Sequence, residues 1–298
     1  FYYIISGDIV ATFLCGIALK YGAKMKKSIH RMLFYVLVLA LCSIFLMPFI
    51  VMLTTSFKTG SDAFTIPVKI LPRQIVWDNY PAALSTIPYM KYMGNTVFIT
   101  ILSVIGQLLV TPMIAYSLSK INWRGAKVIS GLLMAVMMIP YTVTMIPLYR
   151  VFSQLHMTNT YIPLILPAFF GKPFFIIITR QFFNGIPNSL MEAARIDGAN
   201  EFQRYCMIAL PLCKPVLTTV GIYAFMDAWS DYLAPMIYIN KPDKLTLSLG
   251  LQQFMSEYTV RWTELMAAAV LFVLPVLVFF LFFQKNFVQG VATSGLKA

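Results

Sequence analysis

Six long apolar runs constrain this chain more than any other feature. Each has roughly the 20 mostly apolar residues that a helix needs to cross a bilayer core of about 30 Å. Only 11% of the 298 residues are charged, against about 25% in soluble domains. The sequence therefore predicts an all-α, polytopic membrane protein and excludes a water-soluble globule. The six expected spans are Met32 to Thr55, Thr96 to Leu118, Val128 to Tyr149, Tyr161 to Thr179, Val216 to Ile239 and Leu265 to Phe283.

The formal net charge of +12 does not indicate nucleic-acid binding, because that function needs cations clustered on one solvated face. Here Lys and Arg lie mostly in short gaps between the apolar runs. The cysteines lack Cys-x-x-Cys spacing and the histidines lack metal-type neighbours, so we expect neither a disulfide framework nor a metal site. These residues are Cys15, Cys42, Cys206, Cys213, His30 and His156.

The distribution of Lys and Arg predicts the orientation, since short cytoplasmic loops carry the excess. With an even number of spans, the two termini share a side with the gaps after the second and fourth spans. That side has fourteen Lys and Arg, and the opposite side has eight. We therefore expect both termini in the cytoplasm and the loop from Ser56 to Met93 outside.

Residues 1–24 are expected to stand apart from a domain covering residues 25–298. The run Ile4 to Leu19 is short for a span and contains Asp8. Residues 1–24 are then either an extra segment or an interfacial helix. A cleaved signal peptide is less favoured, because no Ala-x-Ala-like cleavage site follows.

Proline recurs inside the runs, where it removes helical hydrogen bonds that lipid cannot replace. So many expected kinks favour a pathway through the membrane over a simple anchor. The prolines are Pro48, Pro112, Pro140, Pro147, Pro163, Pro167, Pro173, Pro235 and Pro275.

The polar segment from Ile186 to Pro215 is longer than a connection requires. Ser189 and Glu192 have capping-box spacing and predict the start of a short helix. Gly198 permits a sharp turn, and a second helix is expected from about Asn200 until Leu210-Pro211 stops it. From the residues alone, this hairpin is either an amphipathic loop on the membrane surface or a docking site.

The sequence Glu192-Ala193-Ala194-x-x-Asp197-Gly198-Ala199, followed by Ile208-Ala209-Leu210-Pro211, resembles the EAA signature of permease subunits of binding-protein-dependent ABC importers. The segments around Thr246 to Phe254 and Gln289 to Lys297 are similar to carbohydrate permeases of the maltose-transporter type. The resemblance runs from about Met25 to Ala298.

The resemblance implies a type I importer permease in the bacterial inner membrane, paired with a homologous second permease, two ATPase subunits and an outer solute-binding protein. It implies that the hairpin is a cytoplasmic coupling helix and that Glu192, Ala193, Ala194, Asp197 and Gly198 contact the ATPase. ATP and Mg²⁺ then belong to the ATPase, because this chain has no Gly-x-x-x-x-Gly-Lys-[Ser/Thr] segment. The expected cargo is an oligosaccharide or related sugar-like solute.

Polar groups in the fifth run predict a solute pathway. Asp227 and Asp231 are four residues apart, hence on one helix face, and carboxylates inside a membrane face protein or water. They belong to a candidate pathway set comprising Tyr141, Asp227, Trp229, Ser230, Asp231 and Gln253. The structural alternative is that Asp231 fixes a kink near Pro235 or pairs with the partner subunit.

Lys172 is a charge inside the fourth run, and an aspartate of the fifth run is its expected partner. Asn95 and Gln107 are expected to bond neighbouring helices, as single amides in membrane helices usually do. The cluster of Met134, Met137, Met138 and Met145 indicates adaptable packing rather than a copper site.

Two other classes of function compete with the importer permease. An ion-coupled secondary transporter would use Asp227 and Asp231 to bind a proton or sodium, but it predicts inverted repeats that are not evident and gives no reason for the hairpin. A membrane-bound transferase would need an aspartate-rich Asp-Asp-x-x-Asp cluster, which the sequence lacks.

Overall fold

The computed structural model describes residues 28–66, 69–255 and 260–295. The segment 1–24, for which the sequence left two readings open, lies outside the described residues. The chain divides into two compact units, the first formed by Phe1–Met90 with Gly250–Val278 and the second by Lys91–Leu249 with Phe279–Ala298. Helices α4 and α15 each run from the first unit into the second.

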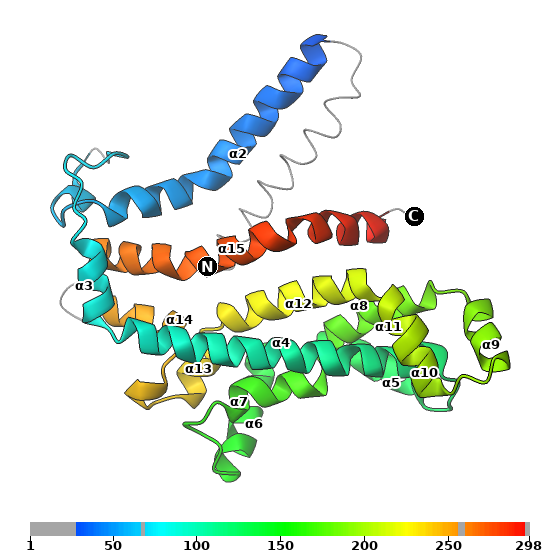
Figure 1. Cartoon of the computed structure of the whole chain (residues 1–298). Helices are drawn as coiled ribbons and strands as arrows, with labels where there is room; N and C mark the ends of the chain where they lie inside the picture. Colours follow the sequence, from blue (N-terminus) through cyan, green and yellow to red (C-terminus); the bar gives the residue numbers. More distant parts are fainter. Residues whose placement is uncertain (1–27, 67–68, 256–259, 296–298) are drawn as a thin grey trace. The chain divides into compact units, whose positions relative to one another are not determined.

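The described elements are helical, apart from one isolated bridge between Met255 and Val260. The first unit contains α2 (Ser28–Ser56), η1 (Asp62–Phe64), α3 (Asn79–Thr86), η5 (Leu251–Phe254), and the first parts of α4 (Tyr89–Lys120) and α15 (Trp262–Gly295). The second unit holds most of α4 and contains α5 (Ala126–Met137), α6 (Tyr141–Gln154), α7 (Ile162–Ile165), η2 (Leu166–Phe170), α8 (Pro173–Asn184), α9 (Asn188–Ile196), α10 (Glu201–Arg204), η3 (Tyr205–Ala209), α11 (Leu210–Leu212), α12 (Lys214–Trp229), α13 (Leu233–Tyr238) and η4 (Pro242–Lys244), while α14 (Leu247–Gly250) ends at the boundary (Figure 1).

Four of the predicted spans are matched by segments long and apolar enough to cross a membrane. Among the described residues these are Met32–Ser56, Tyr89–Lys120, Ile162–Asn184 and Trp262–Phe283. Two further helix pairs pass the same test only when each bent pair is taken as one span. The described chain therefore has four to six candidate spans.

The third expected span, Val128 to Tyr149, is sharply bent near Pro140, one of the prolines at which the sequence predicts a kink. Helix α5 ends at Met137, α6 begins at Tyr141, and the two axes differ by 105°. Pro140 explains the break, since it has no N–H to donate and excludes the preceding residue from helical geometry.

The fifth predicted span, Val216 to Ile239, is also interrupted. Helix α12 begins at Lys214 and ends at Trp229, after which α13 covers only Leu233–Tyr238. A second bend of 76° separates Glu201–Leu212 from Lys214–Trp229.

The positions of the prolines do not reliably predict where the helices break. Pro48, Pro112 and Pro275 lie inside long helices that continue through them. The strongest bend comes at Pro140, which precedes the first residue of its helix.

Helix α4 sets the length of the second unit and separates its two polar ends. With a rise of about 1.5 Å per residue, Asn95 and Lys120 lie roughly 38 Å apart, which exceeds a bilayer core. Near the first end, Asn95 Nδ2 donates to the backbone oxygens of Asp243 and Leu245, at 3.2 and 2.9 Å. At the other end, Lys120 Nζ donates to the backbone oxygen of Ile186 at 2.7 Å. The charge count assigned the gap after the fourth predicted span and the gap after the fifth predicted span to opposite sides of the membrane. In the structure, these two gaps lie at opposite ends of α4.

The break before α8 is stabilised by a buried amide of α4. Gly171 adopts a φ of 78°, which ends η2, and leaves the N–H of Lys172 outside any helix. Gln107 Oε1 accepts that N–H at 3.1 Å and also accepts the Thr111 hydroxyl at 3.0 Å. The expectation that Gln107 bonds a neighbouring segment is confirmed.

Replacing Gln107 with leucine should destabilise the second unit. The change leaves the N–H of Lys172 without its partner, and an unsatisfied buried donor costs about 1 to 3 kcal/mol. Thermal unfolding of the purified chain, followed with a thiol-reactive dye that detects exposure of the buried Cys213, should show a lower Tm. Gln154→Leu, the same change at an exposed residue of α6, is the control and should alter stability by less than about 0.5 kcal/mol. Equal effects of the two variants would show that the Gln107 bonds are unimportant.

Candidate functional site

The hairpin between the fourth and fifth predicted spans begins with α9 and a glycine turn. Gly198 has a φ of 86°, a left-handed conformation that side chains rarely adopt. Its N–H donates to Arg195 O at 3.1 Å, and the N–H of Ala199 donates to Ala194 O at 2.9 Å. These two bonds form a Schellman motif, which satisfies the last carbonyls of α9 and favours glycine at this position.

The predicted capping box between Ser189 and Glu192 is wrong. Helix α9 begins one residue earlier, at Asn188, with Pro187 in the N-cap position and no side-chain cap. A capping box is present instead at α10, where Asn200 Oδ1 accepts the N–H of Gln203 and Gln203 Oε1 accepts the N–H of Asn200. The predicted start of the second helix at about Asn200 is confirmed.

The second arm of the hairpin does not stop at Leu210-Pro211 as predicted. A π-helical turn over Tyr205–Ala209 leads directly into α11, Leu210–Leu212. Pro211 lies in the first turn of α11, where the missing N–H needs no partner. The arm instead turns at Cys213, immediately before α12.

An apolar cluster, here called the α4-end cluster, anchors the hairpin to three long helices. Met191 of α9 is buried in it, beside the ends of α4 and α8, while Leu217 of α12 packs on its edge. The buried members are Ala115, Tyr116, Leu118, Ile176, Phe183, Ile186, Met191, Ala209 and Cys213.

Polar contacts reinforce this anchor around the end of α4. Lys120 Nζ donates to Asn188 Oδ1 at 2.9 Å, which links α4 to the first residue of α9. The Tyr116 hydroxyl donates to Glu201 Oε2 at 3.2 Å, and Glu201 also pairs with Arg204. These hydrogen bonds tie both arms of the hairpin to the end of α4.

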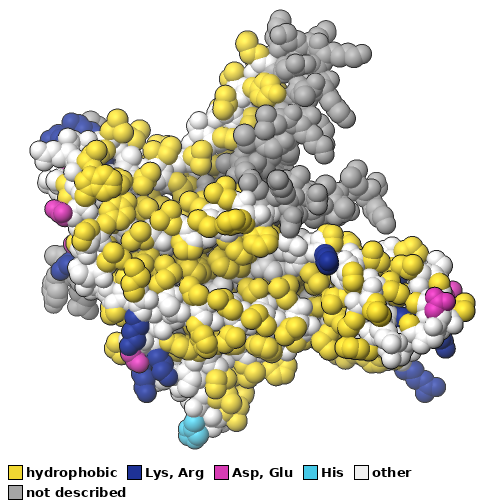
Figure 2. All heavy atoms as spheres, viewed as in Figure 1, with side chains coloured by type: hydrophobic (Ala, Val, Ile, Leu, Met, Phe, Trp, Pro, Cys, Tyr) yellow, Lys and Arg dark blue, Asp and Glu magenta, His cyan; other side chains and the backbone are white. Residues whose placement is uncertain are grey.

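Helix α9 and the turn that follows it carry the five residues predicted to contact the ATPase. Glu192, Ala193, Asp197 and Gly198 are exposed, and Ala194 is half-buried. Nothing lies within 4 Å of a Cβ built on Gly198. Figure 2 shows acidic side chains at the end of the molecule where Figure 1 places α9. These five positions therefore lie on α9 and its C-terminal turn, four of them exposed.

Lys172 and Asp227 form an ion pair between the fourth and fifth predicted spans, as the sequence predicted. Lys172 Nζ lies 2.5 Å from Asp227 Oδ2 and 5.4 Å from the centre of the Phe175 ring. The two side chains are 49% and 27% exposed. The pair is therefore open to the surroundings of the second unit rather than sealed in its core.

Two exposed aromatic residues flank this ion pair. Tyr223 lies one helical turn before Asp227 on α12, and Phe174 is two residues after Lys172. Their ring centres are 6.3 Å apart and their planes are perpendicular. Neither residue belongs to the candidate pathway set, and the signal available for Phe174 was its position directly after the Lys172-Pro173 break.

Asp231 and Ser230 have local structural bonds at the end of α12. Asp231 Oδ1 accepts the N–H of Ala234 at 3.2 Å, which caps the first turn of α13. The Ser230 hydroxyl donates to Met226 O at 2.6 Å, and the Ser248 hydroxyl donates to Asp231 O at 2.5 Å. The geometry of Asp231 agrees with the alternative in which it fixes a kink near Pro235.

The remaining pathway candidates have different surroundings. Trp229 is buried and stacks on Phe225, with ring centres 5.5 Å apart. Tyr141 is exposed at the first residue of α6, and Gln253 is an exposed residue of η5, in the other unit. The structure therefore places Asp231 within electrostatic range of both Asp227 and Lys172, and Tyr141 within electrostatic range of Asp231.

Three of the four clustered methionines are exposed, and Met145 is half-buried. The exposed three are Met134, Met137 and Met138. Among the described residues, no three His, Cys, Asp or Glu side chains lie together as a metal site would require.

Comparisons with known proteins agree with this arrangement. Residues 109–293 match the family described as "Binding-protein-dependent transport system inner membrane component". The chain is 30% identical to the arabinooligosaccharides transport system permease protein AraQ of Bacillus subtilis, over 91% of this chain and 97% of that protein. It is 31% identical to the probable starch degradation products transport system permease protein AmyC of Thermoanaerobacterium thermosulfurigenes, over 91% of this chain and 99% of that protein.

A solved structure shows the same fold. The match is to a chain in the crystal structure of a bacterial ABC transporter involved in the import of the acidic polysaccharide alginate. The TM-score is 0.76 and the sequence identity 26%, and the alignment covers 86% of this chain and 96% of that chain.

Removing one member of the ion pair should destabilise the second unit more than removing both. Lys172→Met leaves the carboxylate of Asp227 without its cation, and we expect a loss of about 1 to 3 kcal/mol, reduced from the value for a sealed pair because both side chains are partly exposed. The double variant Lys172→Met, Asp227→Leu should recover part of that loss. Thermal unfolding of the purified variants measures both effects. If Lys172→Met alone left stability and transport intact, the pairing would be unimportant.

Proposed function

Because this chain belongs to the family of inner-membrane components of binding-protein-dependent transport systems, we propose how it works as one subunit of an ATP-driven importer. The family and the relatives establish a carbohydrate-type ABC importer permease and a multi-pass protein of the bacterial inner membrane. The proposal concerns its coupling, its solute and its partners.

We propose that α9 is the coupling helix and that it docks into a separate ATPase. The observation that carries this proposal is the division of α9 between an anchored and an exposed side. Met191 is buried in the α4-end cluster, while Glu192, Ala193 and Asp197 are exposed. Small side chains permit close approach, and the two carboxylates offer partners for basic groups of an ATPase. The ATPase would supply ATP and Mg²⁺, and this chain would hold no cofactor and hydrolyse nothing itself.

The attachment of the hairpin to the α4-end cluster would allow alternating access. When ATP closes the ATPase pair, the hairpin would move with it and carry the ends of α4, α8 and α12. ATP and the loaded binding protein would each favour one of two packings of these helices. The hairpin end would be cytoplasmic, as the excess of Lys and Arg on that side requires.

The proposed solute is an oligosaccharide or a related sugar-like molecule. The relatives' names mention arabinooligosaccharides, starch degradation products and sulfoquinovosyl glycerol. In this chain the surface formed by Asp227, Lys172, Tyr223 and Phe174 supports a sugar, because charged groups bond hydroxyls and aromatic rings pack on the CH faces of sugars. A solute-binding protein would deliver it to the outer loops at residues 77–88 and 240–264, and a homologous second permease would complete the pathway.

The ion-coupled alternative is less well supported by the geometry. A site for a proton or sodium would use Asp227 and Asp231, yet Asp227 is paired with Lys172 and Asp231 accepts a backbone N–H. Both carboxylates would have to give up these partners on every transport cycle.

The experiment that tests coupling uses two substitutions of Gly198 in the assembled transporter. Gly198→Val should reduce solute uptake into proteoliposomes by about tenfold or more, because a β-branched residue resists the left-handed turn, whereas Gly198→Asn should retain most uptake. Since a Cβ at this position meets nothing within 4 Å, a difference between the variants reports on backbone conformation rather than on a clash inside the chain.

Two further readouts separate coupling from folding. The ATPase should co-purify with the wild-type chain, and Glu192→Lys should let ATP hydrolysis proceed without uptake. Uptake driven by a proton gradient without ATP, or full uptake by Gly198→Val, would contradict the proposal.

A further inference from the structure

The segment between α2 and α3, residues 57–76, has its polarity inverted relative to a loop in water. Lys58 and Asp62 are only 2% and 6% exposed. Ile66 and Leu71 are 95% and 73% exposed, and Phe64, Ile70 and Ile75 are exposed as well. A solvated loop buries apolar side chains and exposes charges, so this segment is built for apolar surroundings.

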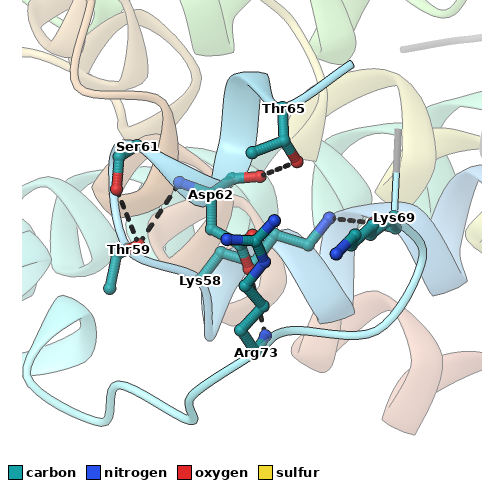
Figure 3. A network of polar contacts seen from close by, with 7 residues as sticks. All are labelled: Lys58, Thr59, Ser61, Asp62, Thr65, Lys69 and Arg73. Carbon is teal, nitrogen blue, oxygen red and sulfur yellow. Dashed lines mark hydrogen bonds and ion pairs between the residues drawn. The ribbon is translucent and has the colours of Figure 1, made fainter. Parts of the chain in front are cut away.

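A polar network inside the segment holds this inverted arrangement (Figure 3). Lys58 Nζ donates to Lys69 O at 2.5 Å. The N–H of Arg73 donates to Asp62 Oδ2 at 3.1 Å, and Arg73 Nε lies 3.5 Å from Asp62 Oδ1. The Thr65 hydroxyl donates to Asp62 O at 3.1 Å. The buried Lys58 ammonium therefore bonds a backbone oxygen, and the buried Asp62 carboxylate bonds the backbone N–H and the exposed side chain of Arg73.

The first unit places this segment at the level where its candidate spans end. It starts directly after Ser56, the last residue of α2, and Asn79 Nδ2 donates to Ser56 O and Lys58 O, both at 2.8 Å. The Phe64 ring lies 6.1 Å from the ring of Trp262, the first residue of α15. A segment fixed to the ends of two bilayer-crossing helices lies at the depth of the lipid headgroups.

We propose that the described residues of this segment, 57–66 and 69–76, form an interfacial anchor that inserts its apolar side chains into the outer leaflet and binds anionic phospholipid. Phe64, Ile66, Ile70, Leu71 and Ile75 provide the apolar contact. Lys69 and Arg73 are exposed beside them, and an apolar surface with flanking cations is the composition of segments that lie in the membrane interface. The surface is continuous with α2, whose apolar side chains are mostly exposed. The proposed anchor depends on contact with the outer leaflet. It does not depend on the proposal that α9 docks into an ATPase.

The test measures the surroundings of single nitroxide labels in the assembled transporter in lipid nanodiscs containing phosphatidylglycerol. The native cysteines are replaced, and labels are placed at Ile66→Cys and Leu71→Cys, with Gln74→Cys as the control at an exposed polar residue of the same segment. A water-soluble nickel complex should reach the first two labels several-fold less than the control, while oxygen should reach them more. Equal access of nickel to all three labels would place the segment in water and overturn the proposal.

A protein partner would give a different result. If residues 66 and 71 packed on the second permease or on the binding protein, oxygen and nickel would both be excluded, and this outcome would also overturn the lipid anchor.

The anionic lipid is tested with Lys69→Gln. The Lys69 backbone oxygen, not its side chain, bonds Lys58, so the substitution leaves the network in place. Replacing phosphatidylcholine with phosphatidylglycerol should lower nickel access at residue 71 several-fold in the wild type and less in Lys69→Gln. Lys241→Gln, which removes an exposed charge from a different loop, should respond like the wild type. The same response in all three proteins would overturn the role of the headgroup.

Discussion

Backbone hydrogen bonding inside the bilayer is the constraint on which the rest of the second unit depends. Lipid offers no partner for an N–H or C=O that a broken helix releases, and this chain breaks its helices repeatedly. At the break before α8, Gln107 accepts the N–H of Lys172. After α12, Asp231 accepts the N–H of Ala234, and Thr96 accepts the N–H of Leu247 at 2.8 Å. Gln107, Asp231 and Thr96 therefore each satisfy a backbone N–H at a place where the chain leaves regular helix.

The sequence predicts the number of apolar runs better than the shape of each span. Run length and hydropathy depend on composition, and they locate α2, α4 and α15 closely. Breaks depend on whether a released backbone group finds a partner elsewhere in the fold. Pro112 and Pro140 look alike in the sequence, yet α4 continues through the first and the chain bends by 105° near the second. No local pattern distinguishes these cases.

The hairpin shows the same limit at a finer scale. Gly198 could be assigned from its residue type, because a sharp turn after a short helix favours glycine, and the structure adds the two Schellman bonds. The capping box could not be assigned, since Ser189 to Glu192 and Asn200 to Gln203 both have the required spacing. Only the second is formed, because α9 starts earlier, at Asn188, after Pro187. The anchoring role of Met191 depends on long-range packing that the sequence does not encode locally.

The ion pair of Lys172 and Asp227 links the structural and functional demands on the second unit. An apolar pair at this position would stabilise the packing of α8 on α12 without the desolvation cost of two charges. The charged pair is retained beside a helix break, and it is partly exposed. Partial exposure lowers the cost of separating the two groups, because water or the hydroxyls of a sugar can replace either partner. The partial exposure of the pair therefore suits a contact that can open and close more readily than one sealed in the core.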